Sequence, residues 1–297
     1  MPSLKEIDNL SGKFILRGGS GCGKTTQIAT LPGKTLVIFT DPAGKESLKG
    51  LNLDGEYEEF LPDSTRIELA SMSTDEKKAK QVVNAPMQEP KAYLECKRYI
   101  DDMVKAKKWE KFDNIVLDSL TGFMNLLMDR IIWINQRSGS TPSLDDYKPV
   151  MQTTFNLVRK LVPIPRRIFI LCHEITDKDF ETGKIIQHHI NVVGNSKDWV
   201  TSQVGSALRM VTHGSGDSMQ YVMETRPQGY LFKGIKTSIR GLPNLVDMTI
   251  RDWNHPQNYG LGQILSRLDK RENDFSDLAF KPGDSNASTQ KKAGAGH

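Results

Sequence analysis

An eight-residue segment near the start of the chain has the residue types and spacing of a phosphate-binding loop. Residues 18–25 read Gly-Gly-Ser-Gly-Cys-Gly-Lys-Thr and complete the pattern G-x-x-x-x-G-K-[ST]. Glycines let consecutive backbone N–H groups point at phosphate oxygens, the Lys24 ammonium can reach the β- and γ-phosphates, and the Thr25 hydroxyl can bind Mg²⁺. We therefore expect ATP and Mg²⁺ as cofactors, with nucleotide contacts from Gly18, Gly19, Ser20, Gly21, Cys22, Gly23, Lys24, Thr25 and Thr26.

Two further groups have positions suited to catalysis at this loop. Asp118 follows the apolar run 115–117, and at the carboxyl end of a parallel strand its carboxylate can join Thr25 in binding Mg²⁺. The alternative is that Asp118 caps the helix that follows. His173 ends another apolar run, where it can sense the γ-phosphate, although a lone histidine is often structural. Its neighbour Glu174 can orient a water molecule or pair with a lysine.

The surrounding segments alternate between strand and helix patterns. Apolar runs at 14–16, 35–39, 115–117 and 168–171 predict buried strands, and helical spacing predicts helices over 25–31, 91–107, 120–134 and 150–162. This alternation is typical of an α/β fold whose mainly parallel sheet has helices on both faces. Three later runs, 207–212, 220–225 and 230–235, predict antiparallel hairpin strands that extend the sheet.

Composition limits the remaining possibilities. The 297 residues suit one ATP-binding domain over 1–270, followed by a polar tail over 271–297 that we expect to be disordered. No run of 18 apolar residues predicts a membrane span, and three cysteines without metal-like spacing favour reduced thiols in the cytoplasm. The net charge of +4 permits nucleic-acid binding without arguing for it.

The order of these motifs resembles the RecA-like core, and in particular the phage-encoded RecA-like ATPases of the Sak type. The resemblance covers residues 12–250 and rests on the phosphate loop, Leu-Asp-Ser-Leu-Thr at 117–121, Cys-His-Glu at 172–174 and the stretch 226–243. It implies a protein of the host cytoplasm that acts on single-stranded DNA in annealing or recombination. It also implies a homo-oligomer, either ring or filament, and a single-strand-binding protein as a further partner.

Carried over by position, the resemblance assigns several more roles. The polar segments 136–148 and 174–200 would be the first and second DNA-binding loops. Lys233, Lys236 or Arg240 would act as a basic finger that reaches the γ-phosphate bound by a neighbouring subunit, where it stabilises transition-state charge. The alternative for these three residues is an exposed basic hairpin face.

One position departs from the RecA-like pattern. Ala43 stands where the family has a catalytic glutamate just past the second strand, so Asp41, Glu46 or Glu174 would have to substitute for it. Because a missing base can lower the rate by about 10²–10⁴-fold, we expect intact ATP binding with slow hydrolysis. The departure also keeps open a scaffold that binds nucleotide without hydrolysing it.

The residues alone argue weakly for DNA. The segment 174–200 carries more acidic than basic side chains, which is unfavourable for phosphate backbone, although Phe180 and Trp199 could stack on bases. Arg166, Arg167 and the helix 97–111 are the better basic candidates. A motor-type NTPase, such as a helicase loader or packaging ATPase that acts on another nucleoprotein, is therefore the alternative function.

Overall fold

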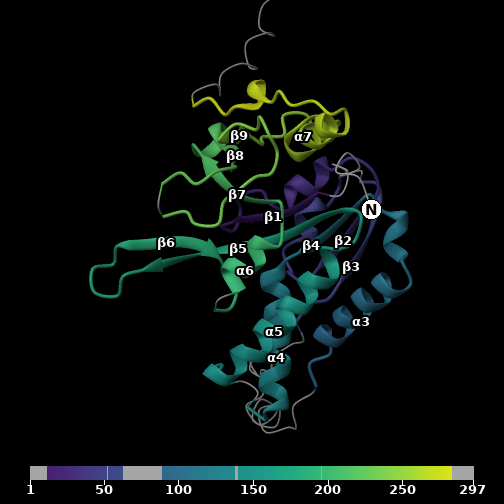
Figure 1. The fold of residues 1–297 in the computed structure, drawn as a ribbon, viewed down its shortest axis with the longest axis vertical. Helices are drawn as coiled ribbons and strands as arrows, with labels where there is room; N and C mark the ends of the chain where they lie inside the picture. The colour runs from purple at the N-terminus through teal and green to yellow at the C-terminus, as the bar shows by residue number, and fades with distance from the viewer. Residues whose placement is uncertain are drawn as a thin grey trace, which may run out of the picture.

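The computed structural model describes residues 12–51, 53–62, 89–137, 140–194, 196–229 and 231–282, and its centre is a large mixed sheet (Figure 1). The strands within these ranges are β1 (Lys13–Gly18), β2 (Thr35–Phe39), β3 (Gly55–Glu59), β4 (Asn114–Asp118), β5 (Arg167–Lys178), β6 (Ile185–Ile190), β7 (Ser206–His213), β8 (Gln220–Glu224) and β9 (Leu245–Asp247). Their order is β3-β2-β4-β5-β1-β7-β8-β9, with β6 paired to β5 alone.

The six strands from β3 to β7 in this order run parallel, and the last two pairings, β7 with β8 and β8 with β9, are antiparallel. One strand, β5, separates the phosphate-loop strand β1 from β4, which ends at Asp118. In register, Gly18 lies opposite His173, and Asp118 lies opposite Phe39. The carboxyl ends of four strands therefore meet at one edge, and the predicted α/β class, with a mainly parallel sheet and antiparallel strands near the carboxyl end of the chain, is confirmed.

Alternate residues of the central strands contribute to two cores, one on each face of the sheet. Ile15, Ile38 and Ile170 pack with α3 (Ala92–Lys105), α4 (Leu120–Ile134) and α5 (Leu144–Leu161). Phe14 and Phe169 stack on the other face, which is covered by η3 (Thr26–Thr30) and α7 (Gly260–Asp269). Both faces are covered because every second residue of a strand points the opposite way.

Several local predictions need correction. The helix after the phosphate loop is a 3-10 helix, η3, that covers only Thr26–Thr30. α5 begins at Leu144 instead of 150, because Ser143 and Asp146 form a capping box, so the segment 136–148 is helical from 144 onward. Residues 138–139 lie outside the described residues. The run 230–235 forms no strand among its described residues, and the third antiparallel strand is β9.

The segment 174–200 is also not a loop. The second half of β5 pairs antiparallel with β6, and the resulting β5–β6 hairpin, residues 174–190, projects from the body of the molecule (Figure 1). The helix α6 (Ser196–Ser202) follows it. Trp199 of this helix packs against Phe155 with 4.2 Å between ring centroids, as a residue at the edge of the core does.

The part of the chain after α7 still contributes to the fold. Phe275 and Leu278, which composition places in the polar tail, are buried in the core beneath α7. Residues 283–297 lie outside the described residues. Among the described helices, none is long and apolar enough to cross a membrane.

Candidate nucleotide site

The phosphate loop connects β1 to η3 at the carboxyl edge of the sheet. Gly21 and Gly23 have φ angles of +74° and +84°, a backbone conformation that favours glycine. A Cβ at Gly23 would also lie 2.8 Å from the Tyr221 ring, so the loop has no room for a side chain there. Lys24 Nζ donates to the Gly18 and Gly19 carbonyls at 3.0 and 2.7 Å, which holds the ammonium inside the curve of the loop.

Thr25 and Asp118 meet directly across the end of the sheet. The Thr25 hydroxyl donates to Asp118 Oδ2 at 2.7 Å. Asp118 does not cap α4, because the Ser119 side chain accepts the hydrogen bond from the Gly122 N–H instead. Burial raises the pKa of Asp118 to about 6, and the Thr25 hydrogen bond opposes that shift. A hydroxyl beside a buried carboxylate is the pair that a phosphate-loop Mg²⁺ site uses.

His173 and Asp41 form a second pair at the same edge. His173 Nε2 lies 2.7 Å from Asp41 Oδ2, and the His173 backbone N–H donates to Thr121 Oγ1 at 3.1 Å. The other Asp41 oxygen accepts from the Ala43 N–H at 3.1 Å. Asp41 is close enough to Asp118 for its charge to raise the pKa of Asp118 further. The structure therefore brings Lys24, Thr25, Asp41, Asp118 and His173 to one place.

Thr40 fixes this geometry by joining the ends of β2 and β4. Its hydroxyl donates to the Ser119 carbonyl at 2.6 Å and accepts from the Ser119 N–H at 3.0 Å. Thr40 is buried, so both interactions are protected from water. Because Asp41 follows Thr40 and Asp118 precedes Ser119, this bridge sets the distance between the two carboxylates.

Two acidic residues considered as substitutes for the missing glutamate lie elsewhere. Glu174 is buried in an ion-pair network, where it accepts from Arg209 at 2.8 Å and lies 3.4 Å from Arg17 Nε. Arg209 also bonds Glu224, and His188 lies 3.6 Å from Glu174. Glu46 is 72% exposed in η4 (Lys45–Leu48), with Lys49 as its ion-pair partner at 3.8 Å. The geometry brings neither to His173, whereas Asp41 bonds it.

The basic residues divide into two groups. Lys233, Lys236 and Arg240 are exposed, and no ion pair within the described part of the chain includes them. In contrast, Arg166 donates to the Phe112 and Glu110 carbonyls, and Arg167 bonds Asp269. Lysines 97 and 111 pair with Asp101 and Glu56. Several of the basic side chains that the sequence suggested as DNA contacts are therefore already paired with groups of the same chain.

The donor set fits Mg-ATP. Glycines free the backbone of the loop, Lys24 supplies a cation, and Thr25 with Asp118 supplies two oxygen ligands for a metal whose other ligands are phosphate oxygens and water. No cluster of three or more His, Cys, Asp or Glu side chains with metal-binding geometry occurs in the described ranges, and such a site does not need one. The structure adds Asp41 to the residues gathered at this edge, and the signal for it in the sequence was its place two residues after β2.

Comparison with known proteins gives the family. No curated protein matches the chain. Among solved structures, the flagellar accessory protein FlaH from Methanocaldococcus jannaschii is 9% identical with a TM-score of 0.37, covering 81% of this chain and 86% of that one. The KaiC-like protein PH0186 from Pyrococcus horikoshii OT3 is 12% identical with a TM-score of 0.37, covering 83% and 88%. The model of an AAA domain family, AAA_24, matches residues 11–234, well over half of the sequence, and the chain therefore belongs to this AAA domain family.

Proposed function

We propose that the protein binds Mg-ATP and hydrolyses it slowly, with Asp41 as the general base. The observation that carries the proposal is the Asp41–His173 pair, 2.7 Å apart, beside the Thr25–Asp118 pair. Asp41 takes a proton from a water molecule whose oxygen attacks the γ-phosphorus, the bond to the β–γ bridging oxygen breaks, and ADP and phosphate leave. Thr25 and Asp118 would hold Mg²⁺, which would neutralise part of the phosphate charge.

The same geometry supports a slow reaction. Both Asp41 oxygens already have partners, the Ala43 N–H and the His173 ring. Neither oxygen can take a proton from water without giving up one of these partners, and the side chain of Asp41 is shorter than the glutamate of the RecA-like pattern. The site is therefore better suited to hold ATP than to turn it over rapidly.

We further propose that the output of the site acts on single-stranded DNA in phage annealing or recombination. The support is the Sak-type resemblance, together with the continuity of β5, which carries His173 and then runs directly into the projecting β5–β6 hairpin. Exposed Lys233, Lys236 and Arg240 remain candidates for a finger toward a neighbouring subunit. The second candidate function is a motor-type ATPase directed at a protein, favoured because Arg166 and Arg167 have partners within the chain.

ATP binding and turnover of the wild type and three variants test the proposal. Lys24→Ala should lose ATP binding, whereas Asp41→Asn should keep it and lose about 100-fold or more in turnover. Glu46→Gln is the matched control, since Glu46 is an acidic residue five positions further along the chain. It should turn over ATP within about twofold of wild type. If the Asp41→Asn variant hydrolysed ATP as fast as the wild type, Asp41 would be excluded as the base. Stimulation by single-stranded DNA supports the DNA assignment, and stimulation by a protein partner alone supports the motor.

A further inference from the structure

The tip of the β5–β6 hairpin presents an aromatic ring to solvent on an ordered turn. Phe180 is fully exposed, in a turn closed by hydrogen bonds from the Asp179 N–H to the Lys184 carbonyl and from the Gly183 N–H to the Asp179 carbonyl. The Asp179 carboxylate also accepts from the N–H and hydroxyl of Thr182, each at 2.7 Å. An aromatic side chain held in water on a structured turn is a strong candidate for an interface anchor.

The charges beside this ring indicate what it contacts. Phe180 lies directly between Asp179 and Glu181 in the sequence, whereas the two lysines of the tip, Lys178 and Lys184, lie outside this pair, at the end of β5 and just before β6. Two carboxylates next to the ring repel a phosphate backbone, so the tip is poorly suited to single-stranded nucleic acid. They favour instead an apolar pocket with cations at its rim.

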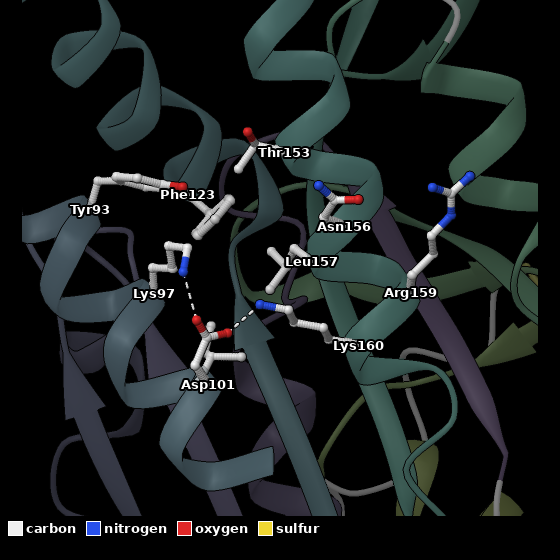
Figure 2. Close-up of a pocket in the computed structure, with 10 residues that line it drawn as sticks. Tyr93, Lys97, Asp101, Phe123, Thr153, Asn156, Leu157, Arg159 and Lys160 are labelled. Atoms are coloured by element: carbon white, nitrogen blue, oxygen red, sulfur yellow. Dashed lines mark hydrogen bonds and ion pairs between the residues drawn. The ribbon is translucent and has the colours of Figure 1, made fainter. Parts of the chain in front are cut away.

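A cleft with these properties lies between α3 and α5 (Figure 2). Its volume is about 380 Å³, and its lining includes the buried side chains of Ile100, Phe123 and Leu157. At its rim, Lys97 and Lys160 both bond the single carboxylate of Asp101. Arg159 also borders the cleft, but its guanidinium lies over the Trp199 ring, 5.2 Å from the ring centroid, and points away from the cleft (Figure 2). The rim therefore carries two lysines against one carboxylate.

A second cleft of the described structure has the opposite charge balance. It lies over β2 and β3, has a volume of about 520 Å³, and its apolar walls include Val37 and Phe39. Its lining carries two lysines against three carboxylates: Lys45, Lys49, Glu46, Asp54 and Glu56. This balance disfavours an acidic tip, and charge complementarity therefore selects the α3–α5 cleft.

We propose that the hairpin tip of one copy inserts Phe180 into the α3–α5 cleft of a second copy, with Asp179 and Glu181 facing Lys97 and Lys160. The hairpin projects from one side of the molecule, and α3 lies on the far side of α5 from it (Figure 1). Each copy thus supplies one tip and offers one cleft, a head-to-tail contact that builds a ring or a filament. The contact goes beyond the ATPase proposal and does not depend on hydrolysis.

Cysteine cross-linking between two variants of the full chain, each with one added cysteine, tests the contact. The natural cysteines Cys22, Cys96 and Cys172 are all buried, so they give little background under native conditions. A mixture of Phe180→Cys and Asn156→Cys chains should form a disulfide-linked heterodimer on mild oxidation. Leu144→Cys, on the same helix as Asn156 but outside the cleft and 91% exposed, is the matched control and should cross-link at least about tenfold less.

Sedimentation equilibrium provides an independent measurement with native cysteines. Phe180→Ala should weaken self-association about tenfold or more, since exposed aromatic anchors dominate such contacts. Glu181→Lys should also weaken it, and Lys160→Glu in the mixed partner should restore it in part.

Four outcomes would overturn the proposal. They are equal cross-linking of Phe180→Cys to Leu144→Cys, preferential cross-linking to Lys49→Cys in the other cleft, symmetric Phe180→Cys homodimers, and unchanged self-association of Phe180→Ala accompanied by weaker binding of single-stranded DNA. None of these outcomes affects Asp41, so failure here is distinct from failure of the ATPase proposal.

Discussion

At Asp118 the requirements of folding and of metal binding oppose each other. Burial raises the pKa of this carboxyl from 3.8 to about 6. Because the folded state holds the proton more tightly than the unfolded state, the free energy of unfolding falls as pH rises from about 4 to about 6 and stays low above that. A shift of this size makes ionised Asp118 unfavourable by about 3 kcal/mol at neutral pH.

Removing that charge should therefore stabilise the protein. Asp118→Asn is expected to raise the thermal midpoint at pH 7, without Mg-ATP, by several degrees, and to flatten its pH dependence between about 4 and 6. Thermal unfolding followed by circular dichroism across this range measures both effects. A lower midpoint than wild type at pH 7 would contradict the prediction.

In the wild type, the affinity for Mg-ATP should decline below about pH 6, as protons compete for the carboxylate.

The sequence predicts a site residue when the pattern that indicates it lies within a few neighbouring residues. Lys24, Thr25, Asp118 and His173 each belong to a short motif or end an apolar run, so their positions at the sheet edge were predictable. The role of Asp41 depended on which carboxylate faces His173, and that contact joins residues 132 positions apart. Glu174 pairs with arginines of β1 and β7 and not with the lysine considered from the sequence, because no local pattern indicates these partners.

Among the elements, α5 depends on a network at its first turn. Ser143 N–H and Oγ both donate to Asp146 Oδ2, and Arg137 bonds the same carboxylate. The Arg137 guanidinium holds the pKa of Asp146 well below its usual range. This contribution to stability is present at neutral pH and is lost only in strong acid.

Ser143→Ala should lower the free energy of unfolding by about 1 kcal/mol, because a capping hydroxyl is lost. Denaturation with urea measures this difference. Ser140→Ala, an exposed serine before the helix, should change stability by less than about 0.5 kcal/mol. Equal losses in the two variants would show that the cap does not stabilise α5.

Elements that the sequence did not predict share a weak local pattern. β3 reads Gly-Glu-Tyr-Glu-Glu and lies at the edge of the sheet, where charged side chains reach water and no apolar run is needed. The β5–β6 hairpin mixes charged and polar residues with exposed isoleucines (Ile175, Ile185 and Ile186), and it gains its structure from pairing. By contrast, β2 is buried along its whole length, and its predicted bounds match those in the structure.

For the whole molecule, we expect ATP turnover below roughly 1 s⁻¹ in the absence of any partner. The reason is that both carboxylate oxygens of Asp41 already have hydrogen-bond partners, and that Ala43 stands where the RecA-like pattern has a glutamate. A coupled assay of phosphate release, corrected with the Lys24→Ala background, measures it. Faster turnover by the isolated protein would show that a stronger base completes the site.

The overall architecture was predictable because alternating apolar strands and amphipathic helices leave few alternatives to a covered parallel sheet. The positions of two surfaces were not predictable, namely the projecting hairpin and the α3–α5 cleft. Both arise from contacts between segments far apart in the sequence, such as Lys160 with Asp101.

Because β5 is continuous from the nucleotide site into the hairpin, a rotation of the strand at the site moves the hairpin tip. From His173 to Phe180 the chain advances seven residues, an arm of roughly 23 Å at about 3.3 Å per residue. A tilt of about 5° at His173 would move the Phe180 ring by roughly 2 Å, enough to seat or unseat it in a pocket lined by close-packed side chains. In the proposed contact, exchange of ATP for ADP would thus change the affinity of one copy for the next.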